Sequence, residues 1–439
     1  MASVKADAEQ SRGTWNSRMG FILAAAGVSI GIGNIWRFPY LVGQNGGGAF
    51  IVAYVAILAL VGIPIMIMEV GIGKSTGKGT IDTYVIGTGK KKLGALLGGY
   101  IAVIPIFINM TYIGIIGYVV YYMYVSFTGM WNSVSPDVIY KNLVDNKLLL
   151  VLLFSGVCII NSWVVYRGVN KGLELACKFM IPLVFVGLIP LLIRAMFLPN
   201  ILKGLNYYMD PNWGALCKLS TWAAAGGQAA FSLGIGPSLM IVYGSHLRKN
   251  TDVTVNVLTV AMLDTSVALL AGFAIIPATV AAGMDPTSGA PLIFIVLPTL
   301  FKMIPGGQIL GVVFFIAVFF AGFSSSISHL ETPVTSYMDH LGWSRGKAVV
   351  IFTLLTIAGG AVCVYNMQFL DIISRWIGDY CYSLSAVIGV IVFGWIYGID
   401  KIRREVNVYS DFKLGAWYNP LLKIVSTGIM AAIVIHSFF

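Results

Sequence analysis

The chain has 439 residues, of which 58% are hydrophobic and only 10% are charged, and its mean hydropathy is +0.85. This composition leaves too little polar surface to cover a water-soluble globule, so it excludes a soluble protein and indicates a membrane protein. The net charge of +10 does not indicate a nucleic-acid partner, because the basic residues are scattered among short segments instead of gathering on one face.

The elements predicted in chain order are membrane-spanning helices. Apolar runs of about 20 residues, the length that crosses a hydrocarbon core of ~30 Å, follow one another along the whole chain. We count eleven, at residues 19–42, 49–72, 96–126, 147–165, 174–196, 221–245, 253–283, 307–337, 347–365, 371–397 and 418–438. No intervening segment is long enough for a soluble domain. We therefore predict one all-α polytopic membrane domain that spans residues 1–439, with lipid around it.

The short segments between the runs predict the orientation. If the N-terminus is cytoplasmic, the cytoplasmic segments contain most of the basic residues, as the positive-inside rule requires. These are Lys5, Arg12, Arg18, Lys74, Lys78, Lys90, Lys91, Lys92, Arg167, Lys171, Arg248, Lys249, Arg345, Lys347, Lys401, Arg403 and Arg404. An odd number of spans then places the C-terminus on the outer side. The polar stretch Met1–Thr14 is too short and too polar for a cleavable signal peptide.

Two of the runs contain helix-breaking sequences. The first has three glycines and an asparagine between residues 27 and 34, and the sixth has Gly234, Gly236 and Pro237 in close succession. Glycine in a membrane span often serves only close packing, and a proline can produce only a kink. Unwound backbone at membrane depth is tolerated where protein or a watery cavity satisfies its polar groups, so a pair of breaks predicts a binding site.

Several motifs resemble the neurotransmitter:sodium symporter family. The resemblance lies in Trp15–Leu23, Gly31–Tyr40 and Asn45–Phe50, and it extends through Gly62–Pro64 with Glu69, Gly227–Gln228 and Ala321–Ser326. It implies a LeuT-like fold in which two inverted repeats of five helices, at about 15–200 and 215–398, have broken helices 1 and 6. The helix at 418–438 is then an additional one, and eleven helices are a variant seen among bacterial members, which implies a bacterial inner (plasma) membrane.

The resemblance implies two Na⁺ sites. One uses the carbonyl groups of Gly27, Ile30 and Ala321 with the hydroxyl groups of Ser324 and Ser325, an all-oxygen set that suits a hard cation. Without the neighbouring motifs, serine hydroxyls that bond to their own helix would be the ordinary interpretation. The other site uses the Ser29 carbonyl with the side chains of Asn34, Ser232 and Asp264.

Asp264 departs from the family pattern, in which asparagine is common. A carboxylate inside a span costs on the order of 3 kcal/mol unless it has a partner, and a bound Na⁺ is a suitable partner. Some relatives use chloride to balance the charge near this site. Because Asp264 supplies a negative charge itself, we expect that chloride is not required. A protonated or helix-paired aspartate is the alternative.

For an amino-acid substrate, the resemblance implies that the Ile32 and Gly33 amides and the Tyr112 hydroxyl hold the carboxylate. Tyr112 could equally be a packing residue. The implied side-chain pocket is formed by Ser29, Ile108, Phe231, Gly234, Pro237, Ser325 and His329.

Two of these pocket residues depart from the family. Pro237 stands where an aromatic residue is usual, and with Gly234 it leaves room for a bulky, flat substrate. His329 replaces an aliphatic residue, and it is a candidate substrate contact, proton-coupled group or metal ligand beside Asp264, or only a structural histidine.

The gates are also implied by the resemblance. Arg37 matches an outer-gate arginine, but Ser374 stands where its acidic partner is expected, so Asp371 or Asp379 becomes a candidate partner. At the inner side, Arg12 with Asp339 and the packing residue Trp15 match the family.

These features predict a Na⁺-coupled symporter, with two ions, that imports a hydrophobic or aromatic amino acid by alternating access. The alternative substrate is an aromatic solute without a carboxylate, such as indole or an aromatic amine, because Asp264 can give Na⁺ its negative ligand.

No motif predicts an enzyme, and the four histidines lie far apart in sequence. The two asymmetric breaks do not form the continuous polar stripe of a channel. The sequence leaves a regulatory receptor of this fold as an alternative. It does not indicate the oligomeric state.

Overall fold

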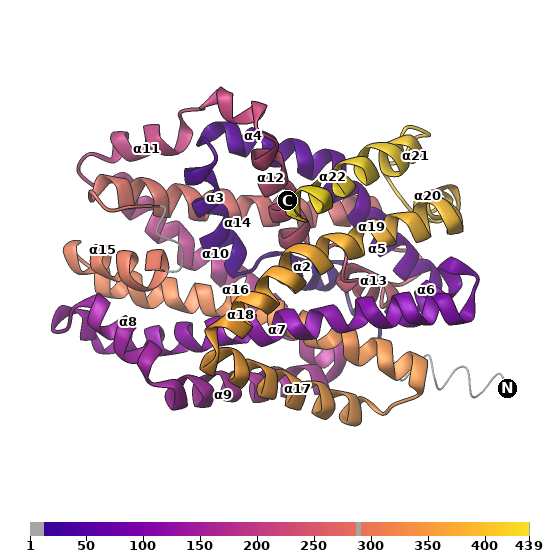
Figure 1. The fold of residues 1–439 in the computed structure, drawn as a ribbon, viewed down its shortest axis with the longest axis horizontal. Helices are drawn as coiled ribbons and strands as arrows, with labels where there is room; N and C mark the ends of the chain where they lie inside the picture. Colours follow the sequence, from indigo (N-terminus) through magenta and orange to yellow (C-terminus); the bar gives the residue numbers. More distant parts are fainter. Residues whose placement is uncertain (1–12, 287–290, 439) are drawn as a thin grey trace.

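The computed structural model of this protein describes residues 13–286 and 291–438. Within these ranges the chain is helical and contains no strand. Figure 1 shows helices that lie roughly along one common direction, as a polytopic membrane bundle requires. The predicted fold class is confirmed.

Nine helices in the described ranges are long and apolar enough to cross a membrane. Several of these helices contain a π-helical segment, so one span can include more than one labelled element. They are Gly48–Thr76 (α4, η2 and α5), Lys91–Thr128 (α7), Lys147–Tyr166 (α9), Val169–Met196 (η4 and α10), Val253–Ala281 (α14), Gly307–Leu341 (α16), Arg345–Tyr365 (α17), Trp376–Asn407 (within η7, α19, η8 and α20) and Tyr418–His436 (within α21, η9 and α22).

Two further spans are interrupted. The first consists of α2 (Arg18–Ser29), η1 (Gly33–Arg37) and α3 (Phe38–Gln44), and its two halves are bent by 55°. The sixth consists of α12 (Leu219–Leu233) and α13 (Leu239–Ser245). By length and composition the described ranges contain nine spans and one bent pair, and α12 with α13 covers the remaining apolar run of the sequence. Both breaks fall where the glycine clusters predict them.

Short helices connect the spans. They are α6 (Thr80–Thr88), η3 (Met130–Asn132), α8 (Pro136–Asp145), α11 (Ile201–Met209), η5 (Trp213–Cys217), η6 (Leu292–Val296), α15 (Leu297–Met303) and α18 (Met367–Ile373).

The two broken spans lie together in the interior. α2 packs against α12, α13, α14 and α16, and α16 in turn packs along α7 and α10. Figure 1 shows α7 crossing the bundle beside α16, with α9 and α17 on its far side. A Cβ atom at Gly234 would lie 2.7 Å from Val28 Cγ1, so the break in the sixth span directly contacts the end of α2. This arrangement gathers the interrupted backbone at the middle of the protein.

Candidate functional site

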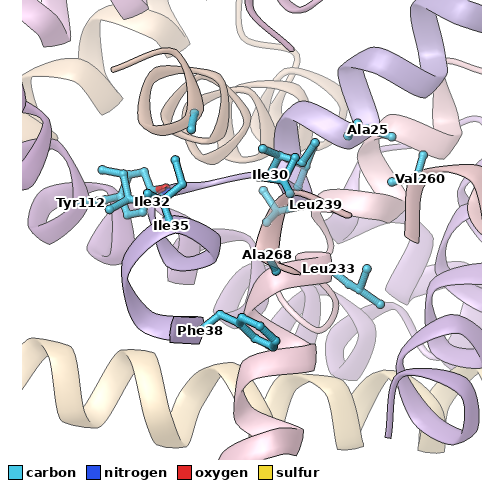
Figure 2. Packing of buried hydrophobic residues seen from close by; sticks show 14 of the residues in the cluster. Ala25, Ile30, Ile32, Ile35, Phe38, Tyr112, Leu233, Leu239, Val260 and Ala268 are labelled. Atoms are coloured by element: carbon cyan, nitrogen blue, oxygen red, sulfur yellow. The ribbon is translucent and has the colours of Figure 1, made fainter. Parts of the chain in front are cut away.

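The break in the first span exposes backbone groups between Ser29 and Gly33. α2 ends because Ile30 adopts an extended conformation, with φ −74° and ψ 102°. The freed amide of Gly31 donates to Asn34 Oδ1 at 3.1 Å, and the freed amide of Ile32 donates to the Tyr112 hydroxyl at 2.8 Å. Figure 2 shows the connecting segment that runs from Ile30 to Ile32, with Tyr112 beside Ile32. Asn34 and Tyr112 therefore satisfy amides that a helix would have paired internally.

Backbone carbonyl oxygens gather around the Ser325 hydroxyl. Ser325 Oγ lies 3.1 Å from the Gly27 oxygen and 3.3 Å from each of the Val28, Ile30 and Ala321 oxygens. Ser324 Oγ lies 3.1 Å from the Ala321 oxygen. The structure thus brings together all five residues that the resemblance implies for one sodium site, and it adds the Val28 carbonyl. A set made only of oxygen atoms has the donor chemistry of a site for a hard cation.

A second polar cluster surrounds Asp264, which is fully buried in α14. Ser232 Oγ donates to the Asp264 carboxylate and lies 2.8 Å from Oδ1 and 2.9 Å from Oδ2. Asn34 Nδ2 donates to Asp264 Oδ1 at 2.6 Å. The Tyr54 hydroxyl lies 3.5 Å from Oδ2. The side chains of Asn34, Ser232 and Asp264 are therefore brought together as predicted. The Ser29 hydroxyl donates to the Ala25 carbonyl within α2, at 3.2 Å, and the predicted role of the Ser29 carbonyl stays a prediction.

A cavity of about 850 Å³ extends from the broken first span to Ser220 and His436. Five of the predicted substrate residues line it, namely Ile32, Gly33, Ile108, Tyr112 and Phe231. Others on its wall were not predicted, and these are Trp36, Tyr40, Thr111, Ile115, Ser220, Ala223, Ala224, Gly227, Gly378, Tyr380, Tyr382, Ser383, Ile433 and His436. This volume is sufficient for a small organic solute.

The other predicted pocket residues, Ser29, Gly234, Pro237, Ser325 and His329, do not line this cavity. The space expected beside Gly234 is occupied by Val28, which corrects the prediction that this glycine leaves room for a flat substrate. His329 is buried in α16, where Nδ1 lies 2.7 Å from the Ser325 carbonyl oxygen and the ring centroid lies 5.8 Å from that of Tyr112. His329 is thus next to the cavity wall but not part of it.

The break in the sixth span is fixed from two sides. The Gly236 amide donates to Oε1 of the buried residue Glu69 at 2.8 Å. On the other side, a Cβ atom at Gly236 would lie 2.8 Å from the Tyr382 carbonyl oxygen of α19 (Tyr382–Gly389). The Gly236 φ of +105° also disfavours any residue with a side chain. Glycine is therefore required where the unwound segment passes between α5 and α19.

The two ends of the bundle differ in their closure. At the end of the bundle that contains the cavity, Arg37 Nη1 donates to Gln228 Oε1 at 2.9 Å. The Arg37 guanidinium carbon lies 5.8 Å from the Phe231 ring centroid. At the opposite end, the Trp15 indole is buried and donates to the Tyr243 carbonyl at 3.0 Å. Asp339 there accepts a hydrogen bond from the Gly79 amide at 2.6 Å. Arg12 and the side chains of Asp371 and Asp379 lie outside the described part, so the predicted pairings of Arg37 and Arg12 stay predictions.

Comparison with known proteins decides the family. The model of the "Sodium:neurotransmitter symporter family" matches residues 12–149 and 147–439. The chain belongs to this family. A sodium-dependent transporter of Methanocaldococcus jannaschii is 34% identical, over 96% of this chain and 90% of its own length. The serotonin transporter of Drosophila melanogaster is 28% identical, over 98% of this chain and 77% of its own length.

The fold of this family member is also found in a solved relative. The crystal structure of MhsT in complex with L-phenylalanine superimposes with a TM-score of 0.87, at 31% identity, over 98% of this chain and all of that one. MhsT has the LeuT-like fold, so the fold implied by the sequence motifs is confirmed. The protein is a multi-pass membrane protein of a family of sodium-dependent transporters with small-molecule substrates.

Sequence reasoning missed two buried contacts. Tyr54 lies in a different span, 210 residues from Asp264, and no motif links the two. Glu174 accepts hydrogen bonds from the Asn16 amide at 2.7 Å and the Ser17 hydroxyl at 3.2 Å, and it pairs with Lys178. The structure also shows why residue 20 is a glycine, since a Cβ atom there would lie 2.0 Å from Glu174 Oε1.

Proposed function

We propose that this protein is a Na⁺-coupled symporter that imports a hydrophobic or aromatic amino acid by alternating access. The observation that supports the amino-acid class most directly is the hydrogen bond between the Ile32 amide and the Tyr112 hydroxyl at the wall of the cavity. Both groups can donate to a carboxylate, and the amide belongs to a helix start, where the helix dipole favours an anion. A substrate carboxylate would bind between them, next to Gly33.

Phe231 and Ile108 form apolar walls beside this polar end. An aromatic or aliphatic side chain would bury its surface there, at about 25 cal/mol per Å². Ser29, Pro237, Ser325 and His329 do not line the cavity in this structure, so they would contact the substrate only after the site closes. The L-phenylalanine in the complex of MhsT supports an amino-acid substrate for this chain.

Two Na⁺ ions would bind in the two oxygen clusters. One ion would bind at the cluster around Ser325, which also contains Gly27, Ile30, Ala321 and Ser324. There the ion would take the place of the Ser325 hydroxyl proton as the partner of the carbonyl oxygens. The other would bind Asp264 with Asn34, Ser232 and the Ser29 carbonyl. Because the Asp264 carboxylate balances the charge of this ion, chloride would not be required.

The closure of the two ends supports an outward-open arrangement. With the N-terminus in the cytoplasm and the C-terminus outside, the cavity would open outward, and the buried residue Trp15 would lie at the cytoplasmic side, where Asp339 and Arg12 are the candidate gate residues. Arg37 would close the outer side after the substrate binds, with Asp371 as its candidate acidic partner. The membrane would be the inner membrane of a bacterium.

The ion gradient supplies enough free energy for accumulation. A tenfold Na⁺ gradient gives about 1.4 kcal/mol per ion, and a membrane potential of ~100 mV adds about 2.3 kcal/mol per ion. Two ions therefore supply about 7 kcal/mol, which corresponds to a concentration ratio on the order of 10⁵ for a neutral solute.

Thermal stability of the purified protein tests the proposal. We would measure Tm with phenylalanine, tyrosine, tryptophan, leucine, indole and tryptamine, each in Na⁺ and in K⁺, with and without chloride. We expect stabilisation by one or more of the amino acids in Na⁺ only, with or without chloride. Stabilisation by indole or tryptamine but by none of the amino acids would instead indicate a carboxylate-free substrate, and the same result in Na⁺ and K⁺ would contradict sodium coupling.

A further inference from the structure

Tyr382 of α19 is a part of the cavity wall that none of the sequence motifs predicted. Its ring lies 5.8 Å from the Phe231 ring, at an interplanar angle of 45°, and it packs with Ile104 and Ile108 of α7. The side chain is only 2% exposed, yet it lines the cavity. Tyr382 thus contributes an aromatic surface to the same wall as Phe231, but from the tenth span.

The backbone of Tyr382 lies against the break in the sixth span. A Cβ atom at Gly236 would lie 2.8 Å from the Tyr382 carbonyl oxygen, so this close approach requires the glycine. The contact fixes the start of α19 beside the broken helix.

Tyr382 lies where the far end of a substrate side chain would reach if the substrate carboxylate bound at Tyr112. Ile108 and Ile104 precede Tyr112 by one and two turns of α7, about 6 and 12 Å at 1.5 Å per residue. A carboxylate at Tyr112 therefore leaves the substrate side chain to extend along the surface that Ile108, Phe231 and Tyr382 share.

The Tyr382 hydroxyl makes no hydrogen bond to the described residues, although Tyr382 lines the cavity. An aliphatic or phenyl side chain would close the site over this hydroxyl without satisfying it, at a cost of about 1–3 kcal/mol. A substrate side chain that carries a hydrogen-bond donor would avoid this cost.

We propose that Tyr382 is a specificity-determining residue whose ring stacks beside the substrate and whose hydroxyl bonds the polar end of the substrate side chain. The favoured substrates are amino acids with an O–H or N–H donor on an aromatic ring. This inference rests on the proposed function and narrows its substrate class from hydrophobic amino acids to those with a phenol or indole side chain.

Competition binding tests the inference. We would measure the inhibition constants of tyrosine, tryptophan, phenylalanine and leucine in Na⁺ for the wild-type protein, Tyr382→Phe and the control Tyr397→Phe. Tyr397 is at the other end of the same span, where its ring lies 5.1 Å from the Lys401 ammonium group. The control makes the same chemical change outside the cavity.

We expect the wild-type protein to bind tyrosine or tryptophan at least about 10-fold more tightly than phenylalanine, because a site built for a donor discriminates against analogues that lack it. Tyr382→Phe should reduce that ratio by about 5- to 10-fold through weaker binding of the donor substrate, while Tyr397→Phe leaves it unchanged. The inference is overturned if wild-type protein binds phenylalanine or leucine as tightly as tyrosine and tryptophan, or if Tyr382→Phe leaves the ratio unchanged. Failure of all four amino acids to bind would instead overturn the proposed function on which the inference rests.

Discussion

The two candidate sodium sites are built on different principles, although both begin at the break in the first span. The cluster at Ser325 consists of neutral oxygen atoms, four of them backbone carbonyls. The cluster at Asp264 is centred on a buried carboxylate that accepts from Ser232 and Asn34. The first site therefore depends on backbone shape, and the second depends on one charge.

This difference indicates separate roles. The carbonyl site joins the end of α2 to α16, so an ion there would fix the position of the broken helix. The Asp264 site joins the first span to α12 and α14, close to where the substrate carboxylate would bind. We expect single side-chain changes to have a large effect at the charged site and a small effect at the carbonyl site.

The largest effect is expected from Asp264→Asn. This change removes the charge and keeps the shape, and loss of one member of a buried charge pair costs about 3 kcal/mol, on the order of 100-fold in affinity. The Na⁺ concentration for half-maximal substrate binding should rise by that factor. Ser266→Ala is the matched control, because Ser266 is two residues away and its hydroxyl bonds the Met262 carbonyl of its own helix. An unchanged sodium dependence in Asp264→Asn would remove Asp264 from the sodium site.

Tyr112→Phe tests whether the Tyr112 hydroxyl binds the carboxylate of the substrate. Removal of the hydroxyl should weaken amino-acid binding by about 10- to 100-fold, because hydrogen bonds to a charged group contribute about 1.5–3 kcal/mol. Binding of the corresponding decarboxylated amine should not change. The measurement is competition binding at saturating Na⁺, and equal losses for the acid and the amine would contradict a carboxylate contact.

A smaller effect is expected from Ser325→Ala. The variant loses one hydroxyl ligand but keeps the carbonyl oxygens of Gly27, Ile30 and Ala321, so we expect a loss of about 1 kcal/mol, roughly 5-fold in sodium affinity. Sodium titration of substrate binding measures it, again beside Ser266→Ala. A loss as large as that of Asp264→Asn would show that the two sites do not differ in the way described above.

Replacement of chloride by gluconate should have the smallest effect. Because Asp264 already supplies a negative charge, we expect less than about a twofold change in sodium-dependent binding. The assay is the same titration at constant ionic strength. A strong requirement for chloride would mean that the Asp264 carboxylate does not balance the charge of the ion.

The sequence predicts the fold well because its signals are local. Hydropathy marks the eleven runs, and glycine and proline mark both breaks, since these residues act on their own segment of backbone. The motif resemblance also places Gly27, Ile30, Ala321, Ser324 and Ser325 in one cluster, which the structure brings together.

The remaining features depend on contacts between distant spans. The space beside Gly234 is filled by Val28, and only the packing of α2 against the sixth span shows this. Tyr54 approaches Asp264, and Tyr382 enters the cavity wall, from helices that contain no motif for these roles. A tyrosine in an apolar run looks the same in the sequence whether it packs against lipid or lines a cavity.

Uptake into proteoliposomes tests the central claim most directly. The purified protein would be reconstituted, and accumulation of labelled tyrosine, tryptophan and phenylalanine would be followed with an inward Na⁺ gradient, with equal Na⁺ on both sides and with K⁺ in place of Na⁺. We predict that at least one of these amino acids accumulates above its external concentration only while the inward Na⁺ gradient persists. Equal uptake in K⁺, or sodium-dependent binding without accumulation of any of the three, would contradict Na⁺-coupled amino-acid symport.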